Sequence, residues 1–517
     1  MHLGIDFGTT RTVVAACDRG NYPVVSFSSE DGDYADWYPS LIAERNGELC
    51  CGWAALARAA DRSWTMIRSF KRLLTDPTMR PDHVVCVGSL EMPLIDLLVT
   101  FLSSLHHDLR THSNMREALH DADRIPVLIA TPANAHGTQR FFTLDAFRKA
   151  GFDVLALLNE PSAAGFEYAH RHRSSFTSKR EHVVVYDLGG GTFDASLVRM
   201  SGQHHDIVYT SGVPRLGGDD FDTVLVDLVL AEKGMAGVVV DGPLRERLAD
   251  VCREAKETLG QGSRRVLVDV ESALGDRAPV QEVALPVSTY YEACTPLIER
   301  SIEAMMQVVE RDDLGDGTGS LPGVAGIYVV GGASALPAVG RTLKHRFGRR
   351  VHRSPYPSAA TAMGLAIAGD KEAGYLLTDR FSRAFGVFRE LRDGAAVSFD
   401  PIFTKETRMP TQQEGRVTSS RTYRAAHNIG HFRYVECETV DLSGCPSGDI
   451  TPFAEVLFPF DPALCGREDD LRVVPIRRMA SPGPLVEEQY AVDANGMVEV
   501  LIRNLDAGYE RAFRLWG

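Results

Sequence analysis

Two segments of the sequence could bind the phosphates of a nucleotide. GIDFGTT (residues 4–10) and YDLGGGTFD (residues 186–194) share one scheme, in which a strand ends in aspartate and a glycine-rich turn with threonine leads into a returning strand. Glycine tolerates positive φ angles and lets backbone N–H groups approach an anion closely. The strand-end aspartates would repel phosphate, but they suit a hydrated Mg²⁺ ion, which takes one or two carboxylates and keeps several waters. The scheme therefore predicts a site for a nucleotide with Mg²⁺.

The repetition of this scheme carries the prediction. An ordinary hairpin explains a single glycine-rich turn equally well, whereas two copies about 180 residues apart, each opening its own block of the chain, point to one shared site. The sequence has no GxxxxGK[ST] motif, which excludes a P-loop nucleotide site.

The elements that must position the two hairpins follow from the hydrophobic periodicity. The first block of the chain predicts strands at residues 3–6, 12–17 and 126–130 and helices at 92–105 and 138–150. The second block predicts a connector at 170–180, a hairpin at 183–198, helices at 219–233, 243–259 and 288–311, a Gly- and Asp-rich loop at 312–323, and a strand and turn at 327–332.

The pattern changes in the third block, after residues 376–379. From Phe385 onward, short alternating runs are separated by turn residues, which predicts an all-β region. The clearest of these runs lie at residues 433–440, 453–458 and 497–503.

Composition narrows the class of protein. The chain has 517 residues, 44% of them hydrophobic and 24% charged, which is typical of a globular protein of about three domains. Its formal charge of −14 argues against nucleic acid as a partner, because nucleic-acid affinity depends on Lys and Arg. The N-terminus lacks the pattern of a signal peptide, and no apolar stretch is long enough to span a bilayer. The nine scattered cysteines indicate a reducing compartment, so we expect a cytoplasmic protein without a membrane partner.

These motifs resemble those of the DnaK, or heat-shock protein 70, family of chaperones. LGIDFGTTRTVVA and VVVYDLGGGTFDASLV resemble its two phosphate motifs, SFKRLL its catalytic-lysine segment and VVGGASALP its adenosine motif. IATPA, LLNEPSAAGFEYA and RLGGDDFD stand in the family's order. LLTD resembles its linker and RAFGV the start of its substrate domain, while DPIFTKETRMP and VDANGMVEV are similar to later segments of that domain.

The resemblance implies an α/β fold. A two-lobed actin-like ATPase domain, built from duplicated ribonuclease-H-like units, would span residues 1–375, with lobes at about 1–170 and 171–375. A linker would follow at 376–384. A β-sandwich of the substrate-binding type, without the family's helical lid, would occupy 385–517.

The resemblance also implies roles for individual residues. Asp6 and Asp187 would hold Mg²⁺ through its waters, and Lys71 would position the attacking water. Pro132 and Arg140 would relay the nucleotide state to the linker. The implied catalytic residues are Lys71, Glu160, Asp187, Thr192 and Asp194. The implied nucleotide-binding residues are Gly8, Thr9, Thr10, Arg11, Gly189, Gly190, Gly191, Gly217, Gly218, Lys256, Gly331, Gly332 and Ser334.

Several positions depart from the family. Ala335 replaces an arginine that stacks on adenine, a contact worth about 1–2 kcal/mol. Arg253 and Glu254 reverse the usual acid-then-base order, and Gly260 replaces a serine. Ala156 stands where a basic residue would dock a J-domain cochaperone. We therefore expect ATP or ADP with Mg²⁺, and K⁺ as a further candidate ion, with altered contacts to the base.

Two functions fit this sequence. The first is a lidless, divergent chaperone whose ATP hydrolysis controls the binding of unfolded or extended polypeptide, with a cochaperone or nucleotide-exchange factor as a further partner. The second is a nucleotide-switched module that docks one protein client. It is favoured by the polar segments 389–397 and 419–429, which take the place of the family's peptide-gripping loops. A metabolite kinase of the same superfold is a weaker alternative, because the motifs follow the chaperones throughout.

Overall fold

A computed structural model describes the chain except residues 30–31, 81, 172–180, 311–320, 322, 467, 480–481 and 516–517. Most of the predicted connector at 170–180 and of the predicted loop at 312–323 therefore lies outside the described residues. The chain forms two compact units. Unit 1 comprises Met1–Arg72, His107–Ala133 and Asn159–Leu377, and unit 2 comprises Leu73–His106, Asn134–Leu158 and Thr378–Gly517. The predicted domain boundaries stay a prediction.

The first phosphate-motif hairpin lies in a mixed sheet of unit 1. Strand β1 (Leu3–Phe7) runs antiparallel to β2 (Arg11–Ala16) and parallel to β11 (Ile125–Thr131), and β5 (Tyr38–Pro39) pairs with β2. Almost every residue of β1 and β2 is buried, which is typical of strands covered on both faces. The strands predicted at 3–6, 12–17 and 126–130 are confirmed.

The second phosphate-motif hairpin repeats this local pairing in another sheet of unit 1. Strand β13 (His182–Leu188) runs antiparallel to β14 (Thr192–Ser201) and parallel to β18 (Val324–Val330). The complete sheet has the order β19-β18-β13-β14-β15-β20. Its other members are β15 (His204–Pro214), β19 (Val351–Arg353) and β20 (Leu376–Thr378).

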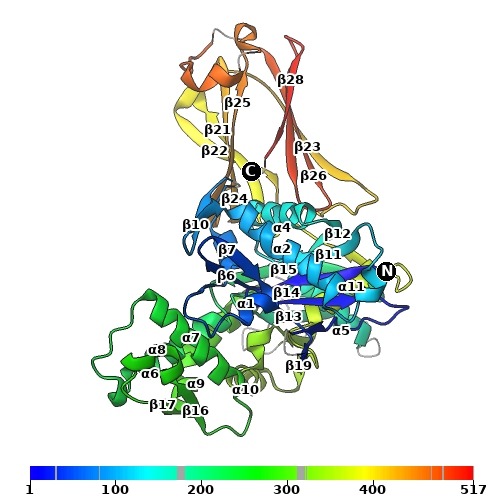
Figure 1. The fold of residues 1–517 in the computed structure, drawn as a ribbon. Coiled ribbons are helices and arrows are strands. Elements are labelled where there is room, and N and C mark those ends of the chain that lie inside the picture. Colours follow the sequence, from blue (N-terminus) through cyan, green and yellow to red (C-terminus); the bar gives the residue numbers. More distant parts are fainter. Residues whose placement is uncertain are drawn as a thin grey trace. The chain divides into compact units, whose positions relative to one another are not determined.

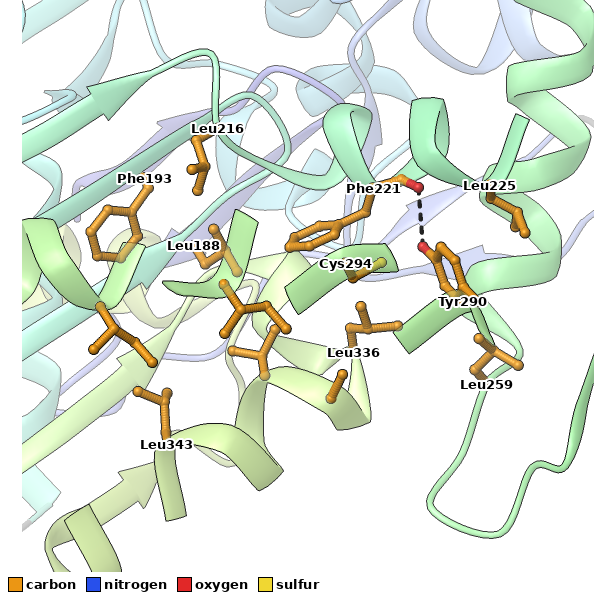
Figure 2. Close-up of a cluster of buried hydrophobic side chains, with 14 of the residues drawn as sticks. Leu188, Phe193, Leu216, Phe221, Leu225, Leu259, Tyr290, Cys294, Leu336 and Leu343 are labelled. Atoms are coloured by element: carbon orange, nitrogen blue, oxygen red, sulfur yellow. Dashed lines mark hydrogen bonds between the residues drawn. The ribbon is translucent and has the colours of Figure 1, made fainter. Parts of the chain in front are cut away.

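Helices cover the second sheet and form the core shown in Figure 2. Leu188 and Phe193 from the hairpin pack in this core with Phe221, whose carbonyl oxygen accepts a hydrogen bond from the Tyr290 hydroxyl at 3.1 Å. The helices predicted in this block are confirmed to within a few residues. The helices of this part of unit 1 and its small hairpin are α5 (Glu160–Arg171), α6 (Gly218–Ala231), α7 (Gly242–Glu257), α8 (Val270–Leu274), α9 (Val287–Glu310), α10 (Pro337–Phe347), α11 (Ala360–Gly369), β16 (Arg265–Asp269) and β17 (Glu282–Pro286). Helices α5 and α11 lie outside the core of Figure 2.

Smaller elements complete unit 1, and two longer ones contain residues of both units. Those of unit 1 are β3 (Phe27–Ser28), β4 (Tyr34–Ala35), β6 (Leu41–Arg45), β7 (Glu48–Cys51), α1 (Gly52–Leu56), β8 (Thr65–Arg68) and α3 (Arg116–Leu119). Those shared between the units are α2 (Leu94–Thr111) and β12 (Phe152–Asn159).

Two four-stranded antiparallel sheets, which face each other in Figure 1, dominate unit 2. One has the order β22-β21-β24-β25 and the other β23-β26-β27-β28. Phe385 and Tyr434 from the first sheet and Tyr490 and Val500 from the second belong to one buried cluster. The strands are β21 (Ala384–Leu391), β22 (Ala396–Phe403), β23 (Arg416–Arg424), β24 (Ile429–Val440), β25 (Pro446–Pro459), β26 (Leu485–Asp493), β27 (Val498–Asn504) and β28 (Tyr509–Arg514).

The all-β prediction for the C-terminal region is confirmed, since the described residues after Phe385 hold only strands, turns and short 3₁₀ helices. Unit 2 also contains the hairpin β9 (Val84–Val87)–β10 (Leu90–Pro93) and helix α4 (Gly137–Lys149). Across the described part of the chain, every helix is too short or too polar to cross a membrane.

Helix α4 is joined to the two sheets within unit 2. Its first residue, Gly137, donates its backbone N–H to Glu436 Oε2 at 2.9 Å, and Arg140 donates to the Asn495 carbonyl at 3.2 Å. A Cβ atom on Gly137 would lie 2.1 Å from the Phe453 ring, so no side chain fits there. Residues far apart in the sequence therefore form one packed interface.

Candidate functional site

A cavity of about 300 Å³ in unit 1 collects most of the predicted site residues. Its volume lies at the lower end of the range for small-molecule pockets. Of the predicted residues, Asp194, Gly217 and Ser334 do not line it. Those that line it are Asp6, Gly8, Thr9, Thr10, Arg11, Lys71, Glu160, Asp187, Gly189, Gly190, Gly191, Thr192, Gly218, Lys256, Gly331 and Gly332.

Hydrogen bonds to Ser40 hold the first glycine turn in place. The Gly8 N–H donates to the Asp6 carbonyl at 3.0 Å, which closes the turn at the end of β1. The Ser40 hydroxyl donates to the Gly8 carbonyl at 2.8 Å, and the Ser40 N–H donates to the Thr10 carbonyl at 3.1 Å. Backbone groups and the Ser40 side chain therefore define the shape of this turn.

The second glycine turn is held by the N-terminus of α6. The N–H groups of Gly218 and Asp219 donate to the carbonyls of Gly189 and Gly190 at 3.0 and 2.9 Å. A Cβ atom on Gly217 would lie only 2.7 Å from the Gly190 backbone, so this position requires glycine. Gly217 thus does not line the cavity but lets two backbone segments meet.

The two turns face each other directly. A Cβ atom on Gly190 would lie 2.7 Å from Thr10 Oγ1, and one on Gly191 would lie 2.6 Å from Thr9 Oγ1. The glycines and threonines of the two motifs therefore converge on one place, although about 180 residues separate them in the sequence. Backbone N–H groups and hydroxyls gathered in this way can bind phosphate oxygens.

Carboxylates gather at the ends of the two hairpin strands. Burial and, after it, the charge of Glu160 raise the pKa of Asp6 to about 7, against the opposing effect of Lys71. Burial, followed by the charges of Glu160, Asp6 and Asp194, raises the pKa of Asp187 well above its usual value, against the opposing effect of Lys71. Buried carboxylates that repel one another this strongly favour a bound cation, so the residues fit a Mg²⁺ ion.

Lys71 lies in the 3₁₀ helix Phe70–Thr75, and its side chain is only 6% exposed. Its Nζ donates to Glu160 Oε1 at 3.0 Å, at the start of α5, and lies 5.4 Å from the centre of the Phe7 ring. A buried ammonium group that is hydrogen-bonded to a carboxylate is restricted in position, and a preorganised cation of this kind can stabilise negative charge that develops nearby.

Arg72 is a residue that the sequence reasoning missed. Its Nη2 donates to the Gly191 carbonyl at 3.0 Å and to Asp220 Oδ2 at 2.8 Å. The preceding Ser69 donates to Asp219, which lines the cavity, at 2.7 Å. The Lys71 segment is therefore fastened to the second glycine turn and to α6. The second aspartate in GGDD was a signal for these contacts, but no local pattern links it to Arg72.

At the end of the cavity near α7, charged side chains form ion pairs with one another. Lys256 Nζ donates to the Gly218 carbonyl at 2.9 Å and pairs with Asp222 at 2.6 Å. Arg253 pairs with both Asp219 and Asp222 at 3.1 Å, and Arg11 pairs with Glu257 at 2.5 Å. The charges at this end are matched within the protein itself.

Aliphatic residues form the rest of that end. Leu259 and Leu336 belong to the core of Figure 2 and line the cavity beside Ala335. Pro357 and Thr361, near the start of α11, also line the cavity. These two positions lie outside the motifs found in the sequence.

Gly331 and Gly332 allow a test that separates folding from binding. Gly331 has a φ of 85°, and its Cβ would lie 2.4 Å from Asp187 Oδ1, whereas nothing lies within 4 Å of a Cβ on Gly332. We expect Gly331→Ala to lower the thermal unfolding midpoint, because the positive φ alone costs roughly 1–2 kcal/mol. Gly332→Ala should leave the midpoint unchanged and lower only ADP affinity. Calorimetry and ADP titration check this. Equal midpoints for the two variants would contradict the assigned geometry.

One comparison with known protein families bears on the site. The family model described as Hsp70 protein matches residues 109–430, more than half of the chain. The matched region includes the second glycine hairpin, Glu160, α6, α7 and strands β21–β23. The first hairpin and Lys71 lie before it, so their place at the same cavity is an independent observation.

Proposed function

Because the chain belongs to the Hsp70 family, a family of chaperone-type ATPases, we propose that it is an ATP-dependent molecular chaperone of the DnaK type. It would bind and hydrolyse ATP in the cavity between the two glycine turns, and the nucleotide state would control how its C-terminal β-domain binds polypeptide. The observation that carries the proposal is the convergence of both phosphate motifs, Lys71 and Glu160 on one cavity.

The proposed organisation follows the family. An actin-like ATPase domain of two ribonuclease-H-like lobes would span residues 1–375, with lobes at about 1–170 and 171–375. The matching strand pairings around β1 and β13 support this duplication. A linker would span 376–384, and residues 385–517 would form a β-sandwich, supported by the two sheets that share one core. We place the protein in the cytoplasm.

The proposed chemistry assigns each group one task. The two turns bind the β- and γ-phosphates through backbone N–H groups and the hydroxyls of Thr9, Thr10 and Thr192. Asp6 and Asp187 hold Mg²⁺ through its waters, and Asp194 orients waters nearby. A bound Mg²⁺ ion would neutralise charge on the phosphate oxygens.

Water attack on the γ-phosphate would then depend on positioning. Lys71 and Glu160 orient the water, and the Lys71 ammonium offsets the negative charge that develops on the phosphate. Gly217 and Gly218 let the second turn approach the phosphates. Lys256, Gly331, Gly332 and Ser334 would serve the nucleoside end.

A second function is favoured by one observation in unit 2. Glu488 is fully buried between the two sheets, where Arg389 from the opposite sheet donates to its two carboxylate oxygens at 3.1 and 2.7 Å. The hydroxyls of Tyr423 and Tyr490 also donate to Glu488, and Asp400 accepts from Arg389 at 2.6 Å.

Two members of this network, Arg389 and Tyr423, belong to the polar segments 389–397 and 419–429 that take the place of the family's peptide-gripping loops. In the structure these two residues lie in strands β21 and β23. A hydrophobic peptide inserted between the sheets would have to break a buried ion pair, which costs about 3–5 kcal/mol when one partner is left unpaired. The observation supports a nucleotide-switched module that docks a specific protein client instead of gripping extended chains.

Kinetics of peptide exchange would test the main proposal. A fluorescent extended peptide should dissociate at least tenfold faster from the ATP-bound than from the ADP-bound protein, with single-turnover ATP hydrolysis measured on the same preparations with and without peptide. Identical peptide rates in both nucleotides would refute the coupling. Three results together would instead establish the docking module. The protein would hydrolyse ATP without binding the peptide, it would not protect a denaturing model enzyme from aggregation, and affinity isolation would recover one tightly bound partner.

A further inference from the structure

We propose that His107, Asp108 and His112 form a binding site for a divalent transition metal, with Zn²⁺ as the ion that fits best. His107 and Asp108 lie in the last turn of α2 and His112 directly follows the helix; all three belong to unit 1. One ligand atom from each lies within 4.8 Å of the others. Both histidines are exposed and Asp108 is half-buried, so an ion can reach them from solvent.

The spacing of the ligand atoms is close to what a metal requires. Zn²⁺ in a tetrahedral site has bonds of about 2.0–2.2 Å to nitrogen and oxygen, which places neighbouring ligand atoms roughly 3.3 Å apart. Asp108 Oδ1 and His112 Nδ1 are already 3.3 Å apart. The rings of His107 and His112 have centroids 6.2 Å apart. Since all three ligand atoms lie within 4.8 Å of one another, they need to approach by at most about 1.5 Å to reach the spacing of a Zn²⁺ site.

The surrounding residues hold the ligands in position. The fully buried Tyr38 donates its hydroxyl to Asp108 Oδ2 at 2.7 Å, which leaves Oδ1 directed toward His112. The His112 carbonyl accepts from the backbone N–H and the hydroxyl of Ser28 at 2.8 and 3.1 Å, which anchors it to β3. Of these contacts, the Tyr38 hydrogen bond acts on a ligand carboxylate itself, and the loss of such a partner typically costs 10–100-fold in metal affinity.

The chemistry of the ligands selects the class of metal. Two imidazoles with one carboxylate suit Zn²⁺ and similar first-row ions, whereas Mg²⁺ prefers oxygen ligands alone. The C-terminal end of a helix carries partial negative charge, which favours a cation there. The proposed site therefore differs in metal preference from the carboxylate cluster around Asp6, and it does not depend on the proposed ATPase activity.

A zinc titration of the full chain tests this inference. The nucleotide-free protein is stripped of metal, supplied with excess Mg²⁺ to saturate oxygen-only sites, and titrated with Zn²⁺ against a chromogenic chelator. We expect the double variant His107→Ala, His112→Ala to bind one equivalent fewer than the wild type, and each single variant to lose at least tenfold in affinity. Zn²⁺ bound at cysteines would be common to all of these proteins and would cancel.

His120→Ala serves as the matched control. His120 is an exposed histidine 2.9 Å from Asp121, and it lies outside the three-ligand group. Its removal should change neither the number of sites nor their affinity. Zn²⁺ should also raise the thermal unfolding midpoint of the wild type and of His120→Ala, but not that of the double variant. Equal zinc stoichiometry and affinity in the wild type and the double variant would overturn the proposal, and circular dichroism confirms that the variants are folded.

Discussion

Replacing Lys71 with alanine is expected to slow ATP hydrolysis by about 10²–10³-fold, the usual cost of losing one preorganised group that stabilises the transition state. The ammonium group is buried and held at 3.0 Å by Glu160, so bulk water cannot easily replace it. ADP has no γ-phosphate, and its affinity should stay within a few-fold of the wild-type value. Single-turnover hydrolysis and calorimetric ADP titration measure the two effects separately.

Two further variants sharpen this test. Thr192→Ala should resemble Lys71→Ala, because both residues are proposed to act at the γ-phosphate. Lys149→Ala is the control, since Lys149 also pairs with a carboxylate, Asp145 at 2.8 Å, but is 52% exposed and is not among the residues that line the cavity. It should hydrolyse ATP at the wild-type rate. A loss of ADP affinity as large as the loss of hydrolysis would contradict the role given to Lys71.

Replacing Asp6 with asparagine is expected to stabilise the metal-free protein while weakening its binding of nucleotide with Mg²⁺. The pKa of Asp6 is about 7 in the folded protein against an ordinary value of 3.8, so the native state retains a proton that the unfolded chain has lost. The free energy of unfolding therefore falls as the pH rises from about 4 to 7. The full penalty applies above pH 7, and at 1.36 kcal/mol per pKa unit it amounts to about 4 kcal/mol.

The pH dependence of unfolding checks this prediction. Unfolding midpoints in chelator should be higher for Asp6→Asn than for the wild type at pH 8, and the difference should shrink toward pH 5. Asp18→Asn removes an exposed carboxylate from the same part of the chain and should give no such gain. With Mg²⁺ and nucleotide present, the ranking should reverse, because only the wild type gains binding energy. An Asn variant that is no more stable at pH 8 would show that the carboxylates at this site do not oppose folding.

The hairpins, most helices and the all-β end of the chain could be predicted from the sequence, because each depends on local periodicity and turn chemistry. The gathering of Thr9, Thr10, Gly190 and Gly191 at one cavity also followed from recognising a repeated motif. Both kinds of inference use short stretches of sequence. The structure agrees with them because strand pairing in a hairpin, helix formation and turn geometry are determined within such stretches.

Contacts between distant segments could not be predicted in this way. Arg72 reaches Gly191 and Asp220 across more than 100 residues, and no local pattern links either of them to Arg72. The exchange of acid for base at Arg253 was visible in the sequence, but its partners Asp219 and Asp222 were not. The contacts of such side chains depend on how several helices and strands pack together. They can be assigned only from the three-dimensional structure.

The way α4 is built into unit 2 limits how this chain could recombine with its relatives. A chimera that received only residues 378–517 from another protein would replace the residues that α4 contacts. Gly137 has no room for a side chain beside Phe453, and Arg140 donates to the Asn495 carbonyl, so both contacts depend on the replaced segment. Transferring residues 134–158 together with the β-strands would keep these matched surfaces intact. The β-strands of unit 2 and helix α4 are therefore encoded by two separate stretches of the gene that have to be exchanged together. We expect substitutions in α4 to be accompanied by substitutions in the strands that it contacts.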